Sequence, residues 1–139
     1  MERIMGLDLG SRTLGIAVSD PLGMIARTVE TFRFADDDYD AACARAVQLA
    51  KELGAVKFVL GLPKHMNGDV GIRGQLSLDF KAKLEAACCL PVILQDERLT
   101  TAAAERILIS ADVSRKKRKA VIDQMAAVQI LQSYLDQKR

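Results

Sequence analysis

Alternating hydrophobic and polar positions open the chain and predict β-strands. The pattern predicts strands over Ile4–Leu9 and Leu14–Ser19, which pair as a hairpin through a turn at Gly10–Arg12. A third strand is predicted over Thr28–Phe34. The first part of the chain is therefore expected to form an antiparallel arrangement of strands.

The hydrophobic period then changes to that of α-helices. Apolar residues at helical spacing predict a helix over Tyr39–Leu53, and Gly54 is expected to end it. Three more helices are predicted: Gln75–Ala87, a helix capped by Thr100 or Thr101 that runs through Ile109, and a helix from about Lys119 to Lys138 that follows a basic run.

Two largely apolar runs follow predicted helices. These runs, Val56–Pro63 and Leu90–Glu97, are typical of buried parallel strands, and a glycine-rich loop over His65–Gly74 follows the first of them. The order β-β-β-α-β-α-β-α-α predicts an α/β fold, with an antiparallel hairpin first and parallel crossovers afterwards. At 139 residues, half of them hydrophobic, the chain is expected to form one domain over residues 1–139.

Composition limits the chemistry that this fold can carry. No run approaches the length of a membrane span, and the three cysteines lack metal-ligand spacing, so we expect a cytoplasmic protein with reduced thiols and no membrane partner. His65 is the single histidine, which argues against a serine or cysteine hydrolase triad. Carboxylates are therefore expected to carry any acid, base or metal chemistry.

Asp8 is a carboxylate inside the first apolar strand. Strand alternation places it on one face with Ile4 and Gly6. A carboxylate there is costly unless it is paired, protonated or bound to a cation. An equally good interpretation is a turn-capping aspartate that accepts hydrogen bonds from the amides of Gly10 and Ser11.

Asp96 and Glu97 end the last apolar strand. The carboxyl ends of parallel strands are where α/β proteins bind their ligands, although strand ends are polar in any case. Alternation puts the two side chains on opposite faces, so one of them is expected to face a site.

Asp123 lies within the apolar stripe of the last predicted helix. Helical spacing places it between Ile130 and Tyr134, on the arc that also holds Ala127, so it is expected to face the sheet. The alternative is a first-turn aspartate favoured by the helix dipole. We prefer the functional interpretation because the stripe itself is apolar.

Three converging carboxylates favour a metal centre. Like charges raise one another's pKa unless a divalent cation neutralises them, and oxygen ligands suit Mg²⁺ or Mn²⁺. Two such ions about 4 Å apart could activate water and stabilise the leaving oxygen in phosphodiester cleavage.

A basic run of five residues would contact the phosphates, although such a run alone more often marks a solvated loop. The predicted nucleic-acid-binding residues are Arg12, Lys64, Arg73, Arg98, Arg115, Lys116, Lys117, Arg118 and Lys119.

Four ordered motifs resemble the YqgF family, also called RuvX, of the RNase H-like superfamily. They are "GLDLGSRTLGIAVSDPLG", "GLPKHMNGDVGIRGQ", "DERLTT" and "RKKRKAVIDQMAA". The resemblance implies a five-stranded mixed sheet, with its first three strands antiparallel, flanked by helices. It also implies a metal-dependent nuclease with Asp8, Glu97 and Asp123 as catalytic residues and metal ligands, which favours Glu97 over Asp96.

The family's described roles leave two nucleic-acid substrates open. One is the 5′ end of pre-16S rRNA, which is matured during ribosome biogenesis. This role implies association with the ribosome. The other is the Holliday junction of DNA recombination and repair, which needs two symmetric cuts and therefore a homodimer, whereas a monomer favours the RNA role. A non-catalytic RNA-binding module is a further alternative. The first hairpin also resembles sugar kinases and actin-like ATPases, but those enzymes close two such domains around ATP.

Overall fold

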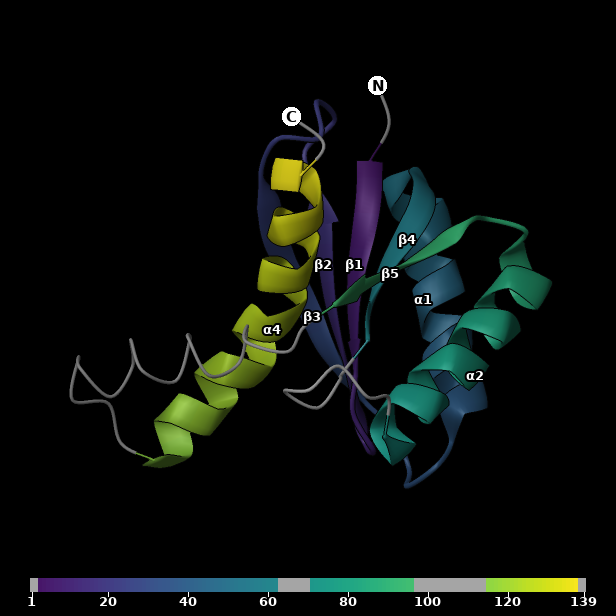
Figure 1. The fold of residues 1–139 in the computed structure, drawn as a ribbon, viewed down its shortest axis with the longest axis vertical. Helices are drawn as coiled ribbons and strands as arrows, with labels where there is room; N and C mark the ends of the chain where they lie inside the picture. The colour runs from purple at the N-terminus through teal and green to yellow at the C-terminus, as the bar shows by residue number, and fades with distance from the viewer. Residues whose placement is uncertain (1–2, 63–70, 97–114, 138–139) are drawn as a thin grey trace.

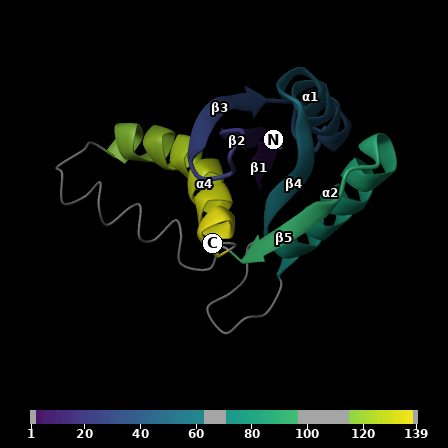
Figure 2. The same cartoon turned by 90° about the horizontal axis from the view of Figure 1, so that it is seen from above.

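A mixed five-stranded sheet with helices on both faces forms the protein (Figures 1 and 2). The computed structural model describes residues 3–62, 71–96 and 115–137, without the side chains of 72–73 and 115–124. The strands are β1 (Arg3–Leu9), β2 (Thr13–Ser19), β3 (Ala26–Arg33), β4 (Ala55–Leu62) and β5 (Val92–Asp96). Their order in the sheet is β3-β2-β1-β4-β5.

The first three strands are antiparallel and the last two are parallel to β1. The amide of Gly10 donates to the carbonyl of Thr13 at 2.8 Å and closes the β1–β2 turn. Strand β1 lies at the centre, between β2 and β4, so its carboxyl end adjoins that of β4. The expected fold class is confirmed.

The helices are α1 (Tyr39–Leu53), α2 (Ile72–Cys88) and α4 (Arg115–Gln137). Figure 2 shows α1 and α2 on one face of the sheet and α4 on the other. Asp38 caps α1 by accepting from the amide of Ala41, and Gly54 ends it in the left-handed conformation with φ 71°. The predicted bounds of α1 are therefore confirmed at both ends.

Two predicted helix starts are wrong. Helix α2 begins at Ile72, inside the predicted loop, because the amide of Gln75 already donates to the carbonyl of Gly71 at 3.0 Å. Helix α4 begins at Arg115, so the basic run lies in its first turns and is not a loop ahead of it. Unbranched Lys and Arg side chains favour helices, and neither Gly nor Pro interrupts residues 115–137.

Smaller differences concern strand ends. Strand β3 begins at Ala26, two residues before the predicted Thr28. The predicted helix through Ile109 and the predicted strand residue Glu97 lie outside the described residues. In the described part of the chain, no helix has the length and hydrophobicity needed to cross a membrane.

Two hydrophobic clusters pack the two faces of the sheet. Met5, Leu7 and Leu9 belong to the cluster under α1 and α2. Ile4 packs against the other cluster, which consists of sheet residues and α4 residues such as Ala127. The alternation predicted for β1 is therefore confirmed, and it places Asp8 on the α4 face.

Candidate functional site

Asp8 lies near the carboxyl end of the central strand β1, one residue before the strand ends. It is half-buried, while its neighbours Leu7 and Leu9 are buried on the opposite face. Because β4 and β5 run parallel to β1, Asp8 lies at the sheet edge where parallel α/β folds bind ligands.

Glycines flank Asp8 on both neighbouring strands. Asp8 pairs with Gly15 of β2. On the other side, Leu7 pairs with Leu60, so the next residue pair along these parallel strands brings Gly61 of β4 beside Asp8. Both glycines are buried and lie on the α4 face, two residues from Ala17 and Val59 of the α4 cluster. Neither adjacent strand therefore places a side chain at the position paired with Asp8.

Helix α4 crosses β1 in direct contact beside this site. A Cβ on Gly6 would lie 2.6 Å from the Cβ of Leu131 and 2.9 Å from the carbonyl oxygen of Ala127. Figure 1 shows α4 running opposite to β1, so its early turns lie toward the carboxyl end of that strand. Helical position 123 is one turn before Ala127 and thus lies on the Asp8 side of the Gly6 contact.

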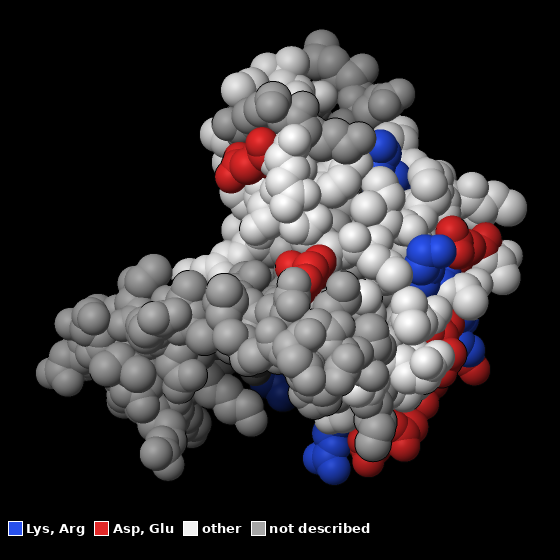
Figure 3. Space-filling view, viewed as in Figure 1, with Lys and Arg blue, Asp and Glu red and all other residues white. Residues whose placement is uncertain are grey.

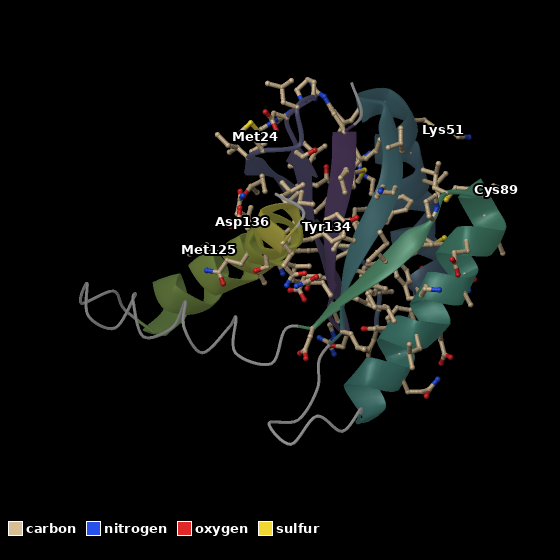
Figure 4. The ribbon with its side chains drawn as sticks, turned by 45° about the horizontal axis from the view of Figure 1, so that its top comes forward. Met24, Lys51, Cys89, Met125, Tyr134 and Asp136 are labelled. Carbon is tan, nitrogen blue, oxygen red and sulfur yellow. The ribbon has the colours of Figure 1, made fainter. Side chains whose placement is uncertain are left out.

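The burial of α4 agrees with the predicted apolar stripe. Ala127, Ile130 and Leu131 are buried against the sheet, as is Tyr134. Figure 4 shows Tyr134 on the sheet side of α4 and Asp136 away from it. The side chain of Asp123 lies outside the described residues.

Asp96 does not share the face of Asp8. Val92 and Leu94 lie on the same face of β5 as Asp96, because alternate residues of a strand share a face, and they pack with the α1–α2 cluster. Asp96 itself is exposed. Ile93 packs with the α4 cluster, so the odd positions of β5 belong to the Asp8 face. Glu97 lies outside the described residues.

Gln95 is a site residue that the sequence interpretation missed. It is only 8% exposed and pairs with Gly61. It lies on the same face of β5 as Ile93, which packs with the α4 cluster. The available signal was its position two residues before Glu97, which strand alternation places on the same face. Asp8, Gly61 and Gln95 therefore form one row across the α4 face.

The alternative prediction, that the Asp8 carboxylate caps the turn by accepting from the amide of Gly10, is wrong. The amide of Gly10 donates to the carbonyl of Thr13 at 2.8 Å and closes the turn through the backbone. The hairpin therefore does not need Asp8 to satisfy this amide.

Arg12 is the predicted nucleic-acid contact whose side chain the structure describes. It lies on the β1–β2 turn, and its Nε is 3.8 Å from a carboxylate oxygen of Asp36. Both side chains are well exposed, at 73% and 59%, so this pair holds Arg12 only weakly. Arg12 therefore keeps its charge available near the carboxyl end of β1.

The remaining predicted contacts are placed only in part. Arg73 belongs to the first turn of α2, and Arg115, Lys116, Lys117, Arg118 and Lys119 belong to the first turns of α4, while Lys64 and Arg98 lie outside the described residues. The β1–β2 turn and the first turns of α2 and α4 lie toward the same end of the sheet in Figure 1. This is the end of the sheet that carries Asp8.

A separate groove of about 620 Å³ lies between α1 and α2, on the opposite face from Asp8. Cys43 forms part of its lining, and burial raises the pKa of this thiol, so the nucleophilic thiolate is disfavoured. In Figure 3, basic and acidic side chains alternate along the side of the molecule that carries α2. Such a mixed surface gives this side no single charge that would attract phosphates.

Only one of the three carboxylates predicted to bind metal belongs to the described side chains. Among them, no three His, Cys, Asp or Glu residues group closely enough to hold a metal ion. Of the predicted acidic ligands, Asp8 alone has a described side chain. The donors that the structure does place on this row are the Asp8 carboxylate and the Gln95 amide.

Two solved structures share this architecture over nearly their whole length. RuvC of Thermus thermophilus, in complex with a Holliday junction substrate, matches with a TM-score of 0.60 at 12% identity, over 99% of this chain and 96% of that one. The fowlpox virus Holliday junction resolvase matches with a TM-score of 0.54 at 15% identity, over 97% and 99%. The fold is thus the RNase H-like fold of RuvC-type nucleases.

Sequence comparison is more specific. The family profile "RuvX: Holliday junction resolvase" matches residues 2–137. Proteins of Bacillus pumilus and Listeria monocytogenes, both named "Putative pre-16S rRNA nuclease", are 54% and 56% identical over 134 residues, 96% of this chain and 97% of each relative. The chain belongs to the RuvX (YqgF) family.

Family and fold together define the class of chemistry. The protein is a phosphodiester-hydrolysing enzyme, and its substrate is a nucleic acid. A nuclease of this RuvC-like fold implies the use of a divalent metal ion.

Proposed function

We propose that the protein is a nuclease that cleaves structured RNA with Asp8 as the central metal-binding carboxylate, and that its substrate is the 5′ leader of pre-16S rRNA. The observation that carries the proposal is the position of Asp8. It is a half-buried carboxylate at the carboxyl end of the central strand, flanked by Gly15 and Gly61.

The residues on this row fit a hard divalent cation. Both described donors, a carboxylate and an amide, offer oxygen, and glycines occupy the positions paired with Asp8 on both neighbouring strands. Oxygen donors suit Mg²⁺ or Mn²⁺, which supply a polarised water and stabilise charge on the leaving oxygen when bound. A purely apolar or sulfur-lined site would not fit such an ion.

Glu97 and Asp123 are proposed to complete the acidic set. Alternation along β5 assigns the position after Asp96 to the face of Asp8 and Gln95, which favours Glu97 over Asp96. Helix α4 brings position 123 toward the same end of β1. In this proposal, the three carboxylates would hold the metal ion, which would supply an activated water for phosphodiester hydrolysis.

The basic residues at this end of the sheet are proposed to bind the nucleic-acid backbone. Arg12 belongs to the β1–β2 turn, Arg73 to the first turn of α2 and the run Arg115–Lys119 to the first turns of α4, and Lys64 and Arg98 belong to the same proposed set. Contacts of this kind position a substrate without reading its sequence. Specificity would then come from the shape of the RNA.

The named relatives support RNA over DNA. Those at 54–56% identity are named for pre-16S rRNA, whereas the junction-bound structure is 12% identical. The second candidate, resolution of Holliday junctions, is favoured by the family description. It requires a homodimer, whereas the RNA role is compatible with a monomer that associates with ribosomal precursors in the cytoplasm.

The experiment is cleavage of two labelled substrates by the purified protein, a pre-16S rRNA leader and a four-way DNA junction, each with Mg²⁺, with Mn²⁺ and with chelator. The proposal predicts metal-dependent cuts in the leader and none in the junction. Paired symmetric cuts in the junction alone would replace it with the resolvase function. If neither substrate is cut but the RNA is still bound, a non-catalytic RNA-binding module is the better description.

A further inference from the structure

Helix α1 carries a stripe of accessible side chains with opposite charges at its two ends. Asp40, Ala44 and Lys51 are exposed, and Val47 is half-buried. Their spacing of four, three and four residues places them on one side of the helix. The Asp40 side chain is 84% exposed, and Figure 4 shows Lys51 pointing outward from the molecule. The stripe is therefore negative at its start, positive at its end, and apolar between.

The stripe forms one wall of the groove of about 620 Å³ between α1 and α2. Lys83 and Ala87 of α2 form the opposite wall. The lining contains two acidic side chains, Asp40 and Glu52, and two lysines, so their charges cancel. A balanced surface of this kind does not attract a polyanion. A partner that fits the groove must instead offer small apolar side chains together with both charges.

A second copy of α1 offers this combination when the two helices run antiparallel. Positions 40, 44, 47 and 51 have the spacing of a coiled-coil seam. The stripe is symmetric about its midpoint, so antiparallel pairing brings Asp40 beside Lys51 of the second copy, and Ala44 beside Val47 of that copy. Parallel pairing would place each charged residue against its own equivalent, and like charges repel. The charges therefore select the antiparallel direction.

We propose that the α1–α2 groove is a homodimer interface, in which α1 packs antiparallel against α1 of a second copy around a twofold axis. A twofold contact requires a surface that is complementary to itself, and the stripe has this property. Its apolar part consists of small side chains, so the interface is a weak one. We expect a reversible dimer with a dissociation constant in the micromolar range.

Antiparallel pairing through α1 keeps the two nuclease sites apart. Helix α1 covers the face of the sheet opposite to Asp8 (Figure 2), so both Asp8 faces point outward from the dimer. Reversing α1 also reverses β1, which puts the two Asp8 residues toward opposite ends. This dimer therefore does not place two sites for symmetric cuts in one junction, and it is compatible with the RNA role.

The test is sedimentation velocity of the protein over a hundredfold range of concentration, without metal or nucleic acid. Wild type is expected to change from monomer to dimer as the concentration rises. Ala44→Arg puts a long charged side chain in the centre of the contact and should weaken dimerisation by about tenfold or more. Ala86→Arg, at an exposed alanine of α2 outside the groove, is the matched control and should dimerise like wild type.

A wild-type protein that stays monomeric throughout this range would overturn the proposal. A dimer that Ala44→Arg leaves unchanged would do the same, because its interface would lie elsewhere on the molecule. Neither result bears on Asp8 or on a metal ion, so the proposed nuclease function is tested separately.

A charge exchange tests the antiparallel direction. Asp40→Lys and Lys51→Glu each place like charges opposite one another in a homodimer, so each variant alone should dimerise less than wild type. In an equimolar mixture of the two variants, both contacts again join opposite charges, and association should return. A mixture that remains as monomeric as the separate variants would contradict antiparallel pairing. Circular dichroism of each variant confirms that the comparison is made on folded protein.

Discussion

Gly6 of β1 and Leu131 of α4 are packed so closely that no side chain fits between them. A Cβ at position 6 would lie 2.6 Å from the Cβ of Leu131, a separation that atoms of this kind do not adopt. This contact fixes how near α4 lies to the central strand, and therefore how near helical position 123 lies to Asp8. Gly6 thus links the packing of the core to the assembly of the site.

Gly6→Ala should lower both stability and activity. The added methyl group must displace α4, because the atoms it meets are a Cβ and a backbone carbonyl and not the end of a flexible side chain. Overpacking of this kind costs about 1–3 kcal/mol, measurable by urea denaturation. We expect cleavage by the folded fraction to fall as well. A variant with wild-type stability and rate would show that α4 does not need this contact.

The ion pair between Glu30 and Arg45 should make stability depend on acid pH. Arg45 donates to both carboxylate oxygens of Glu30, at 2.9 and 2.6 Å, and these hydrogen bonds lower the pKa of Glu30. Because the folded pKa lies below the unfolded value of about 4.3, the stabilisation is present above that pH. It is lost as the pH falls through the folded pKa.

Glu30→Gln is the variant that measures this contribution. At pH 7 it should be less stable than wild type by about 1 kcal/mol, because the pair is partly exposed. The difference should shrink toward zero as the pH falls through the folded pKa of Glu30, as followed by urea denaturation at a series of acid pH values. A difference that does not shrink at any acid pH where both proteins still fold would contradict the assignment.

Cys89 ends α2 in a conformation that favours glycine. Its φ of 58° is left-handed, and its amide donates to the carbonyl of Glu85. Cys89→Gly should therefore stabilise the protein by about 0.5–1 kcal/mol, measured as an increase in melting temperature. The control is Cys88→Gly at the last residue of α2, which packs against the core and has no left-handed backbone, so this substitution should not stabilise the protein. Equal effects of the two substitutions would rule out the backbone explanation.

The basic run should govern the salt dependence of substrate binding. Replacing Lys116, Lys117 and Lys119 by Gln removes three positive charges from the start of α4. If each contacts a phosphate of single-stranded RNA, the slope of log K against log salt should fall by about 0.7 per contact. Lys51→Gln and Lys81→Gln, on the other face of the molecule, should leave the slope unchanged, as titrations between 50 and 200 mM salt would reveal.

The sequence predicted the elements better than it predicted their junctions. The alternation of β1 assigned Asp8 to the correct face because a strand has a strict period of two, and capping at Asp38 and Gly54 defined α1. The start of α4 was misplaced because a run of basic residues was interpreted as a loop. Charge does not prevent helix formation by Lys and Arg, so composition alone gave no boundary there.

Register explains what sequence patterns could not provide for the site. The glycines beside Asp8 come from β2 and β4, and only the pairing of strands far apart in the chain brings Gly15 and Gly61 next to it. The neighbour of Gln95 across the sheet is likewise set by the β4–β5 register. Local periodicity gives the face of a residue but not its partner on the next strand.

The central claim is that Asp8 holds the metal at a nuclease site, and the most direct measurement is cleavage of the labelled pre-16S rRNA leader by wild type and Asp8→Asn at saturating Mn²⁺. Asn keeps the shape of the side chain and removes its charge, so folding should be preserved while the rate falls by roughly 10³-fold or more. Retention of RNA binding by the variant would confirm that the loss is chemical. Cleavage by Asp8→Asn at the wild-type rate would contradict the account.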